Sequence, residues 1–353
     1  MSVSVIIPCL NEEGSIEECI RLVKAAFAGE GKLEIIVADN GSTDRSSELA
    51  KKAGARVVEE RRQGYGSAIL CGIREATGEF LVIGDADNTY DFRDAAILVE
   101  KLKEGAEFAI GDRIHGEVDK GAMPWLHMHL GTPVLTWVLN QFFGCRVHDI
   151  NCGLRAIRRE AVERLRLRSP GMEFASEMVI HAQKAGLKFA ETPIRYYRRH
   201  HGQAKLRTFR DGWRHLRFIL LCAPFPLYFL PAAASAILSA YFYTQPRLGF
   251  LVLASLFSLA AFQFFIFGVL AKTYLWVADS FLVDRGFGSL IDKFKLEYGI
   301  LTSLLFLLGG IVLVREFDIS NLIRGASLIA LSLQIFFSSF LLSTIMFKKR
   351  DTI

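Results

Sequence analysis

The chain has 353 residues, of which 51% are hydrophobic and 22% are charged, and its formal net charge is +5. Its mean hydropathy is +0.29. This composition excludes a disordered chain, a collagen-like fibre and a small disulfide scaffold. At roughly 100–200 residues per domain, the length predicts two or three domains.

The charge is divided unevenly along the chain. Residues 1–194 contain 24 Lys+Arg and 29 Asp+Glu (net −5), residues 195–217 contain 8 and 1 (net +7), and residues 218–353 contain 10 and 7 (net +3). We call residues 195–217 the basic collar. Because the excess positive charge is confined to this short segment, we expect no nucleic-acid partner, which would need an extended basic surface.

Alternating short apolar runs and helix-like stretches fill the first half of the chain. The runs rich in Val, Ile and Phe predict strands at 3–7, 33–38, 55–59, 80–84 and 108–111. The stretches between them predict helices at 13–27, 44–52, 66–75 and 93–104. This alternation predicts an α/β domain, with a parallel sheet covered on both faces, over residues 1–205.

Polar residues follow the predicted strands, at the edge where ligands of such sheets bind. The first strand leads into Asn11 and Glu12, the second into Asp39, and the fourth into Asp85 and Asp87. Asn, Asp and Ser are also common in turns and helix caps, the role we expect for Asp44. Carboxylates that converge on one edge repel each other unless a cation binds there. Asp85 and Asp87 therefore predict a site for Mg²⁺ or Mn²⁺, which prefer oxygen ligands and often hold a diphosphate.

These motifs together resemble family 2 glycosyltransferases. The resemblance rests on three motifs: Val-Ile-Ile-Pro-x-x-Asn-Glu at the first strand, Asp39 in Val-Ala-Asp-Asn-Gly-Ser-Thr-Asp, and Asp85-Ala-Asp87. Within this family the chain is similar to the polyprenyl-phosphate group, which contains the dolichyl-phosphate mannose and glucose synthases. The resemblance covers about residues 1–210 and implies a Rossmann-like nucleotide-sugar-binding domain of the GT-A type.

The resemblance implies a role for each matching position on the donor side. Pro8, Asn11 and Glu12 would line the nucleotide pocket, and Asp39 would bind the base. Asp85 and Asp87, with Ala86 between them, would bind the nucleotide sugar through the metal. Many relatives have a Gln as a further ligand where this chain has Thr89, so the third metal ligand is left open. The segment 63–68 resembles a glycine-containing helix entrance of the family, and a tight turn with small-residue packing explains it equally well.

The resemblance also implies catalytic residues, and those other than Asp87 belong to the acceptor side. Besides Asp87, they are Arg113, Arg199 and Lys205, basic groups suited to clamping phosphates. Ala204 stands where the family usually has Ser. Segments 151–155 and 171–177 also match acceptor-side patterns of the group. For His127 and His129 an ordinary surface role is favoured over acceptor binding, and for Cys145, His148 and Cys152 structural roles are favoured over zinc binding.

Four charge-free segments predict transmembrane helices in residues 218–353, at about 218–246, 248–271, 298–314 and 326–347. Pro224, Pro226 and Pro231 place the start of the first span nearer Leu230. Basic loops favour a multi-pass protein of the cytoplasmic membrane with its catalytic domain in the cytoplasm. The spans contain no Asp, Glu, Lys or Arg, which argues against a transporter.

The end of the basic collar, residues 206–217, predicts an amphipathic helix at the membrane interface. Its arginines recur every three or four residues, at Arg207, Arg210, Arg214 and Arg217. Binding of anionic lipid headgroups explains these four better than catalysis does. Another interfacial helix is expected in the loop 272–299.

The sequence therefore predicts a membrane-bound enzyme that moves a hexose from a nucleotide sugar to polyprenyl phosphate. Metal dependence and inversion at the anomeric carbon follow from the resemblance. Two alternatives remain: a processive polysaccharide synthase, although the Gln-x-x-Arg-Trp motif is missing, and a non-catalytic, membrane-tethered nucleotide-sugar-binding protein. The donor sugar and the oligomeric state, a homo-oligomer included, are left open.

Overall fold

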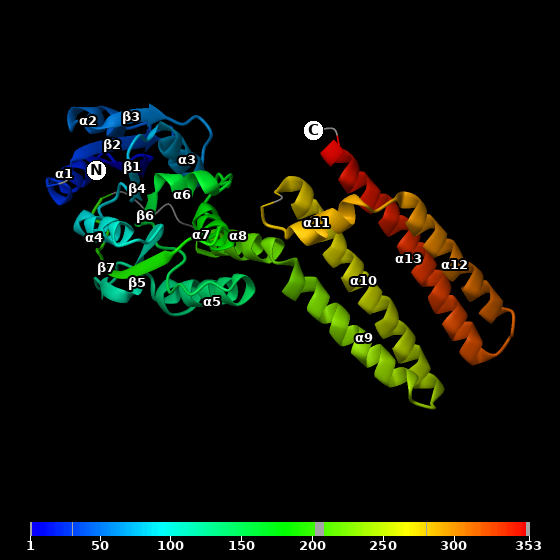
Figure 1. The fold of residues 1–353 in the computed structure, drawn as a ribbon. Coiled ribbons are helices and arrows are strands. Elements are labelled where there is room, and N and C mark those ends of the chain that lie inside the picture. The colour runs from blue at the N-terminus through cyan, green and yellow to red at the C-terminus, as the bar shows by residue number, and fades with distance from the viewer. Residues whose placement is uncertain (1, 30, 202–207, 280, 351–353) are drawn as a thin grey trace. The chain divides into compact units, whose positions relative to one another are not determined.

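A computed structural model describes residues 2–29, 31–201, 208–279 and 281–350 of the chain. Contacts between residues divide the chain into two compact units, Met1–Ile219 and Leu220–Ile353. Each unit is described by itself. The first contains a sheet with helices around it, and the second contains long helices (Figure 1).

The first unit is built on one seven-stranded sheet with the order β3-β2-β1-β4-β6-β5-β7. The strands are β1 (Ser2–Cys9), β2 (Lys32–Asp39), β3 (Arg56–Glu59), β4 (Phe80–Ile83), β5 (Phe108–Val118), β6 (Arg155–Arg158) and β7 (Phe189–Tyr196). The five predicted strands correspond to β1–β5. The expectation of a wholly parallel sheet is wrong, because β6 runs antiparallel to both β4 and β5. β6 follows the loop after α5 (Thr132–Phe143) and starts at the edge of the sheet where β4 ends.

The register of the strands explains why the polar segments converge. Cys9 at the end of β1 pairs with Asp39 at the end of β2. Ile83 at the end of β4 pairs with Arg155 at the start of the antiparallel β6. The carboxyl ends of β1, β2 and β4 and the amino end of β6 therefore lie at one edge of the sheet. β4 is wholly buried, so the acidic residues after it emerge directly from the core.

The helices of this unit are α1 (Ile16–Ala26), α2 (Ser46–Lys52), α3 (Tyr65–Glu75), α4 (Phe92–Lys103), α5 (Thr132–Phe143), α6 (Arg159–Arg164), α7 (Phe174–Lys184) and α8 (Thr208–Cys222). A short π-helical turn, η1 (His127–Gly131), precedes α5. The four helices predicted from the sequence correspond to α1–α4. Asp44 is a turn residue as expected: its carboxylate accepts hydrogen bonds from the backbone N–H groups of Ser46 and Glu13.

The second unit contains η2 (Phe225–Phe229), α9 (Leu230–Tyr243), α10 (Leu248–Ala278), α11 (Arg285–Asp292), α12 (Leu296–Val314) and α13 (Ile319–Arg350). Among the described residues, four segments are long and apolar enough to cross a membrane: Phe225–Tyr243, Leu248–Ala278, Leu296–Val314 and Ile319–Phe347. The first begins later than the charge-free run, which starts at Phe218, and its α-helix starts at Leu230, where the prolines placed it. Residues 218–222 continue α8, and the chain leaves that helix at Ala223 and Pro224.

Small residues let α12 and α13 pack closely, a common feature of helix pairs in membranes. A Cβ atom at Gly310 would lie 2.8 Å from the carbonyl oxygen of Gly325. The Ser332 hydroxyl donates a hydrogen bond of 2.7 Å to the Ser303 carbonyl. The helix expected in the loop 272–299 is α11. Its preceding residue, Asp284, pairs with Lys272 at 2.6 Å, and Asp292 at its end accepts a hydrogen bond from Trp276.

The helix expected from the basic collar is α8, while residues 206 and 207 lie outside the described part of the chain. Arg210 and Arg214 are exposed, whereas Asp211 and His215 are buried. The Nδ1 atom of His215 lies 2.8 Å from the hydroxyl of Ser176 in α7. α8 is therefore not only a surface helix, because its buried side packs against the sheet-containing unit.

We expect protonation of His215 to weaken this packing. Burial lowers the pKa of His215 from 6.5 to about 4. Below pH 6.5 the unfolded chain binds a proton on His215 that the folded chain does not yet bind. The free energy of unfolding is therefore undiminished above pH 6.5 and decreases as the pH falls toward 4. At pH 5 the loss is about 2 kcal/mol. Melting temperatures at pH 7 and pH 5 should therefore differ less in His215→Asn than in the wild type.

The matched control for this measurement is His129→Asn, which removes an exposed histidine. It should keep the pH dependence of the wild type. An equal pH dependence in the wild type and His215→Asn would contradict the assignment.

Candidate active site

Asp85 and Asp87 follow β4 and form an acidic pair. The Tyr65 hydroxyl, at the start of α3, donates a hydrogen bond of 3.0 Å to Asp85 Oδ1. Burial, with a smaller contribution from the charge of Asp87, raises the pKa of Asp85 to about 7. A divalent cation beside Asp85 would favour the charged form of its carboxylate.

Gly153 makes room for this pair. A Cβ atom at this position would lie 2.7 Å from Asp85 Oδ2 and 3.2 Å from the ring of Tyr90. The Gly153 backbone N–H donates a hydrogen bond of 2.8 Å to the Tyr90 hydroxyl. The matching segment 151–155 therefore lies against the acidic pair, as its place at the start of β6 requires.

Thr89 orients Asp87. Its backbone N–H and its hydroxyl donate hydrogen bonds to Asp87 Oδ1, at 3.1 and 2.6 Å. Asn88 has a φ of 59° and accepts a hydrogen bond from the Cys19 thiol, so its side chain is directed to α1. Thr89 has no carboxamide, and the carboxamide of Asn88 is bonded to Cys19 and to the Ser15 carbonyl, so neither takes the place of the Gln that many relatives have. In this structure Thr89 instead orients the carboxylate of Asp87, a candidate metal ligand, through hydrogen bonds.

Arg199 joins the acidic pair to the first strand. Its guanidinium lies 3.2 Å from Asp87 Oδ2 and donates hydrogen bonds to both carboxylate oxygens of Glu12, one of them at 2.6 Å. Three residues singled out from the sequence, Glu12, Asp87 and Arg199, thus meet at one point. Lys205, which the sequence placed beside Arg199, lies outside the described residues.

The segments after β1 and β2 form the other part of the site. Asn11 has a φ of 51°, and its side-chain oxygen accepts a hydrogen bond of 2.7 Å from the Thr43 backbone N–H. Asp39 Oδ2 accepts a weaker one, of 3.3 Å, from the Ser42 N–H. Asp39 Oδ1 is buried and has no hydrogen-bond partner among the described residues. A buried carboxylate oxygen without a donor is costly, so this atom fits the imino or amino group of a nucleotide base.

Pro8 and Ala86 contribute backbone rather than functional groups. Pro8 lies in β1 opposite Ala38 of β2 and has no N–H of its own. The Ala86 carbonyl accepts a hydrogen bond of 2.7 Å from Ser15, which fixes the turn that carries both aspartates.

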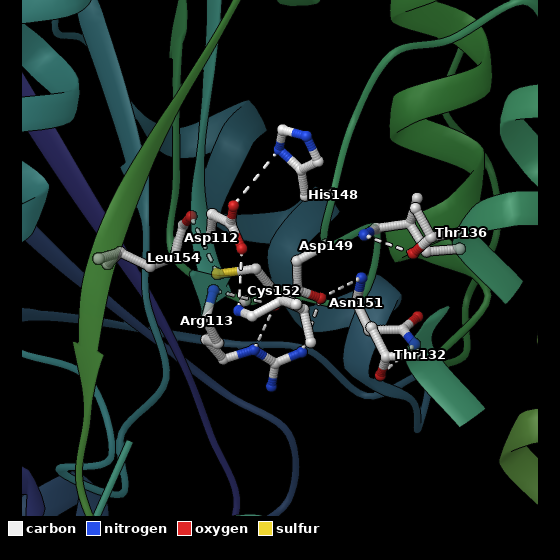
Figure 2. A network of polar contacts seen from close by, with 12 residues as sticks. Asp112, Arg113, Thr132, Thr136, His148, Asp149, Asn151, Cys152 and Leu154 are labelled. Atoms are coloured by element: carbon white, nitrogen blue, oxygen red, sulfur yellow. Dashed lines mark hydrogen bonds and ion pairs between the residues drawn. The ribbon is translucent and has the colours of Figure 1, made fainter. Parts of the chain in front are cut away.

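Arg113 lies at the end of the buried part of β5. Its guanidinium donates one hydrogen bond to each carboxylate oxygen of Asp149, a forked pair (Figure 2). The two hydrogen bonds measure 2.6 and 2.9 Å, and the Tyr196 ring lies 5.2 Å from the guanidinium. Burial opposes the charged form, but Asp149 outweighs it and keeps the pKa of Arg113 well above its ordinary value. The arginine is therefore permanently charged and rigidly placed.

Two residues of the site were not found by sequence reasoning. Tyr65 lies within the glycine-containing segment 63–68, in which the glycines were the recognisable feature. Asp149 lies in a loop, and aspartate is common in turns without a functional role. Cβ atoms at Gly64 and Gly66 would lie 2.1 Å from the carbonyl oxygens of Pro170 and Ser169. Small-residue packing thus accounts for the glycines, and the same packing places Tyr65 over Asp85.

Other matching residues are structural in this arrangement. Arg155 is buried and donates to the carbonyls of Ile150, Cys152 and Ala175. Glu177 accepts hydrogen bonds from the backbone N–H groups of Arg168 and Ser169. Burial raises the pKa of the Cys145 and Cys152 thiols to about 12, which favours the neutral thiol and agrees with structural roles.

The sequence profile described as Glycosyl transferase family 2 matches residues 4–166. A hexosyltransferase of low-salt glycan biosynthesis from Haloferax volcanii is 35% identical over 98% of this chain and 89% of its own length. The chain belongs to glycosyltransferase family 2. It is therefore an enzyme of the transferase class, and the family resemblance drawn from its motifs is confirmed.

Further similarities agree with this assignment. A dolichyl-phosphate hexose transferase from the same organism is 31% identical over 59% of this chain and 88% of its own length. The crystal structure of glucosyl-3-phosphoglycerate synthase from Mycobacterium tuberculosis, in complex with Mn²⁺, UDP and product, superposes with a TM-score of 0.50 and 26% identity. The match covers 62% of this chain and 78% of that one. The expected GT-A-like fold is confirmed.

We expect Gly153→Ala to disrupt the site. The added Cβ would displace Asp85 or Tyr90, so the unfolding free energy should fall by about 1–3 kcal/mol. Transferase activity should fall by at least about tenfold, because the acidic pair loses its geometry.

The matched control is Gly212→Ala in α8, where a Cβ atom would meet no atom within 4 Å. It should keep wild-type activity and stability. Full activity in Gly153→Ala would show that the segment 151–155 does not constrain Asp85.

Proposed function

We propose that the protein transfers a hexose from a nucleotide sugar to a polyprenyl phosphate at the cytoplasmic surface of the membrane. The observation that carries this proposal is the half-buried pair Asp85 and Asp87, with Arg199 on one of its carboxylates. The names of the relatives, a dolichyl-phosphate hexose transferase among them, support the acceptor class. The neighbouring structure with bound Mn²⁺ and UDP supports the donor class and the metal.

On the donor side, Asp39 would bind the base through its unpaired oxygen, and Asn11 and Glu12 would line the pocket beside it. Asp85 and Asp87 would hold Mg²⁺ or Mn²⁺, with Thr89 fixing the orientation of Asp87. When bound, the ion would offset the negative charge that grows on the diphosphate leaving group. The unpaired oxygen of Asp39 and the raised pKa of Asp85 both fit such a ligand set.

Arg199 would change partners during binding. A cation on Asp87 makes the guanidinium on the same carboxylate redundant, so Arg199 would be released toward a phosphate. Arg113 would stay in place because Asp149 holds it through two hydrogen bonds. Lys205 would supply a further positive charge to the acceptor phosphate. Arginine suits this role through bidentate contact with phosphate oxygens.

The acceptor requires no dedicated general base, because a phosphate monoester is already ionised at neutral pH. Its oxygen would attack the anomeric carbon from the side opposite the diphosphate. The bond from that carbon to the diphosphate oxygen breaks as the new bond forms, so the configuration inverts. The chain would contribute position and charge to this step, rather than proton transfer.

The membrane part of the proposal rests on the four long apolar helices and on the basic collar. We propose that these helices anchor the enzyme and that the exposed arginines of α8, among them Arg210 and Arg214, contact anionic headgroups. The positive-inside rule supports a cytoplasmic catalytic unit, which would use cytoplasmic nucleotide sugars.

The decisive assay combines the purified full-length chain, Mn²⁺ or Mg²⁺, a panel of labelled nucleotide sugars and a short-chain polyprenyl phosphate. We expect at least one donor to give a lipid-linked sugar. Asp87→Asn and Asp85→Asn should each lower the rate by at least about 100-fold, because the leaving group loses its charge compensation. A chelator should have the same effect, reversed by added Mn²⁺.

The control is Glu104→Gln, which neutralises an exposed carboxylate next to α4 and should keep the wild-type rate. Absence of a lipid-linked product with every donor would refute the acceptor assignment. An unchanged rate in Asp87→Asn would refute the metal assignment.

A further inference from the structure

A second group of metal-type ligands lies in the first unit, and the function proposed above does not use it. Asp112, His115 and His148 each offer one ligand atom, and these atoms all lie within 4.8 Å of one another. Asp112 and His115 belong to β5, and His148 to the loop before β6. His148 thus has different neighbours from the two cysteines with which the sequence grouped it.

The spacing of these atoms matches that of ligands around one small cation. Asp112 Oδ2 lies 2.6 Å from His115 Nδ1 and 3.4 Å from His148 Nδ1. Glu191 Oε2 of β7 lies 2.9 Å from the same nitrogen of His148. For bonds of about 2.0–2.1 Å in a tetrahedron, neighbouring ligand atoms are about 3.3 Å apart. The separations of 2.6, 2.9 and 3.4 Å lie near or below this value, so small shifts of the side chains would bring Asp112, His115 and His148 around one ion, with Glu191 beside His148.

The two carboxylates are held in place by the backbone. Asp112 Oδ1 accepts hydrogen bonds from the N–H groups of Ile114 and His115, at 2.8 and 3.1 Å. Glu191 Oε1 accepts hydrogen bonds from the N–H groups of His148 and Asp149. Each carboxylate thus has one oxygen fixed and the other directed at the histidines, as Figure 2 shows for Asp112 and His148. Metal ligands are typically oriented by such outer hydrogen bonds.

The sheet register places both carboxylates on the same face. Ile110 pairs with Glu191 and Asp112 with Pro193 between the parallel strands β5 and β7. Residues two apart in a strand point to the same side, so Asp112 and Glu191 are diagonal neighbours. The positions of both carboxylates are therefore set by the pairing of β5 with the edge strand β7, and not by a loop alone.

The charge of this group favours a cation. Among the residues that the structure describes, no lysine or arginine forms an ion pair with Asp112 or Glu191. A divalent ion bound here would offset the negative charge of the two carboxylates. The side chains of His115 and His148 are 57% and 58% exposed, so an ion can reach them from solvent.

We propose that Asp112, His115, His148 and Glu191 form a zinc site separate from the donor site. Two imidazoles and two carboxylates favour Zn²⁺ over Mg²⁺, which prefers oxygen ligands. Asp112 precedes Arg113 and His148 precedes Asp149, so the ion would tie together the two segments that carry the Arg113–Asp149 fork. Zinc would thereby position Arg113, without contact with the substrates.

The test uses the full-length chain with a tag that contains no histidine, on a background of Asp85→Asn and Asp87→Asn that removes the proposed donor metal. The protein is loaded with Zn²⁺, desalted and analysed for bound zinc by mass spectrometry, and the affinity is measured by competition with a chelating dye. We expect about one zinc ion per chain. His115→Ala and His148→Ala should each weaken zinc binding by at least about 10–100-fold.

His129→Ala removes an exposed histidine outside the group and should leave zinc binding unchanged. Asp112→Asn keeps the size of the side chain and should also lose zinc, which guards against an effect of misfolding. Zinc should raise the melting temperature of the background protein and not that of His148→Ala.

Two results would overturn the site. No retained zinc would mean that the histidines only donate hydrogen bonds to the carboxylates. Equal zinc binding in His115→Ala, His148→Ala and His129→Ala would place the ion elsewhere. Because the background lacks Asp85 and Asp87, either result leaves the proposed transferase function untouched.

Discussion

The proximity of two carboxylates, Asp85 and Asp87, at the end of a buried strand is the constraint on which the site depends. β4 delivers both groups from the core into a place with little water, where burial raises the pKa of Asp85 to about 7. The surroundings are arranged accordingly. Tyr65 donates to one carboxylate, Thr89 to the other, and Arg199 offsets part of the charge. Each of these contacts lowers the cost of holding two acids together before a ligand arrives.

The same constraint explains why residues far apart in the chain must cooperate. Asp85 needs a neighbour without a side chain, which Gly153 provides from the start of β6. Tyr65 reaches Asp85 because Gly64 and Gly66 let α3 begin against the loop 169–171. Glu12 shares Arg199 with Asp87 across the ends of β1 and β4. A change at any of these places alters the electrostatics of the acidic pair rather than the core.

Much of this was predictable because regular strands deliver their carboxyl ends to one edge, and polar residues at those ends stand out against apolar runs. Asn11, Asp39, Asp85 and Asp87 were found in this way, and the four apolar helices by length alone. β6 was missed because its four residues carry arginine at both ends. Arg155 is buried only because three carbonyl groups accept its hydrogen bonds, and no local pattern announces that. Asp149 and His148 contact Arg113 and Asp112, which lie far from them in the sequence, so no local pattern reveals these contacts.

The antiparallel direction of β6 has a consequence for how such enzymes can diverge. Its amino end pairs with the carboxyl end of β4, so the whole excursion between β5 and β6 leaves and returns at the same rim of the sheet. That excursion contains η1 and α5 and ends in Asp149 and Gly153. Its length and surface can change without shifting the register of the parallel strands that carry the donor residues. The parallel strands thus carry the donor-side residues, while the excursion adds Arg113's partner Asp149 and, through Gly153, a close contact with Asp85.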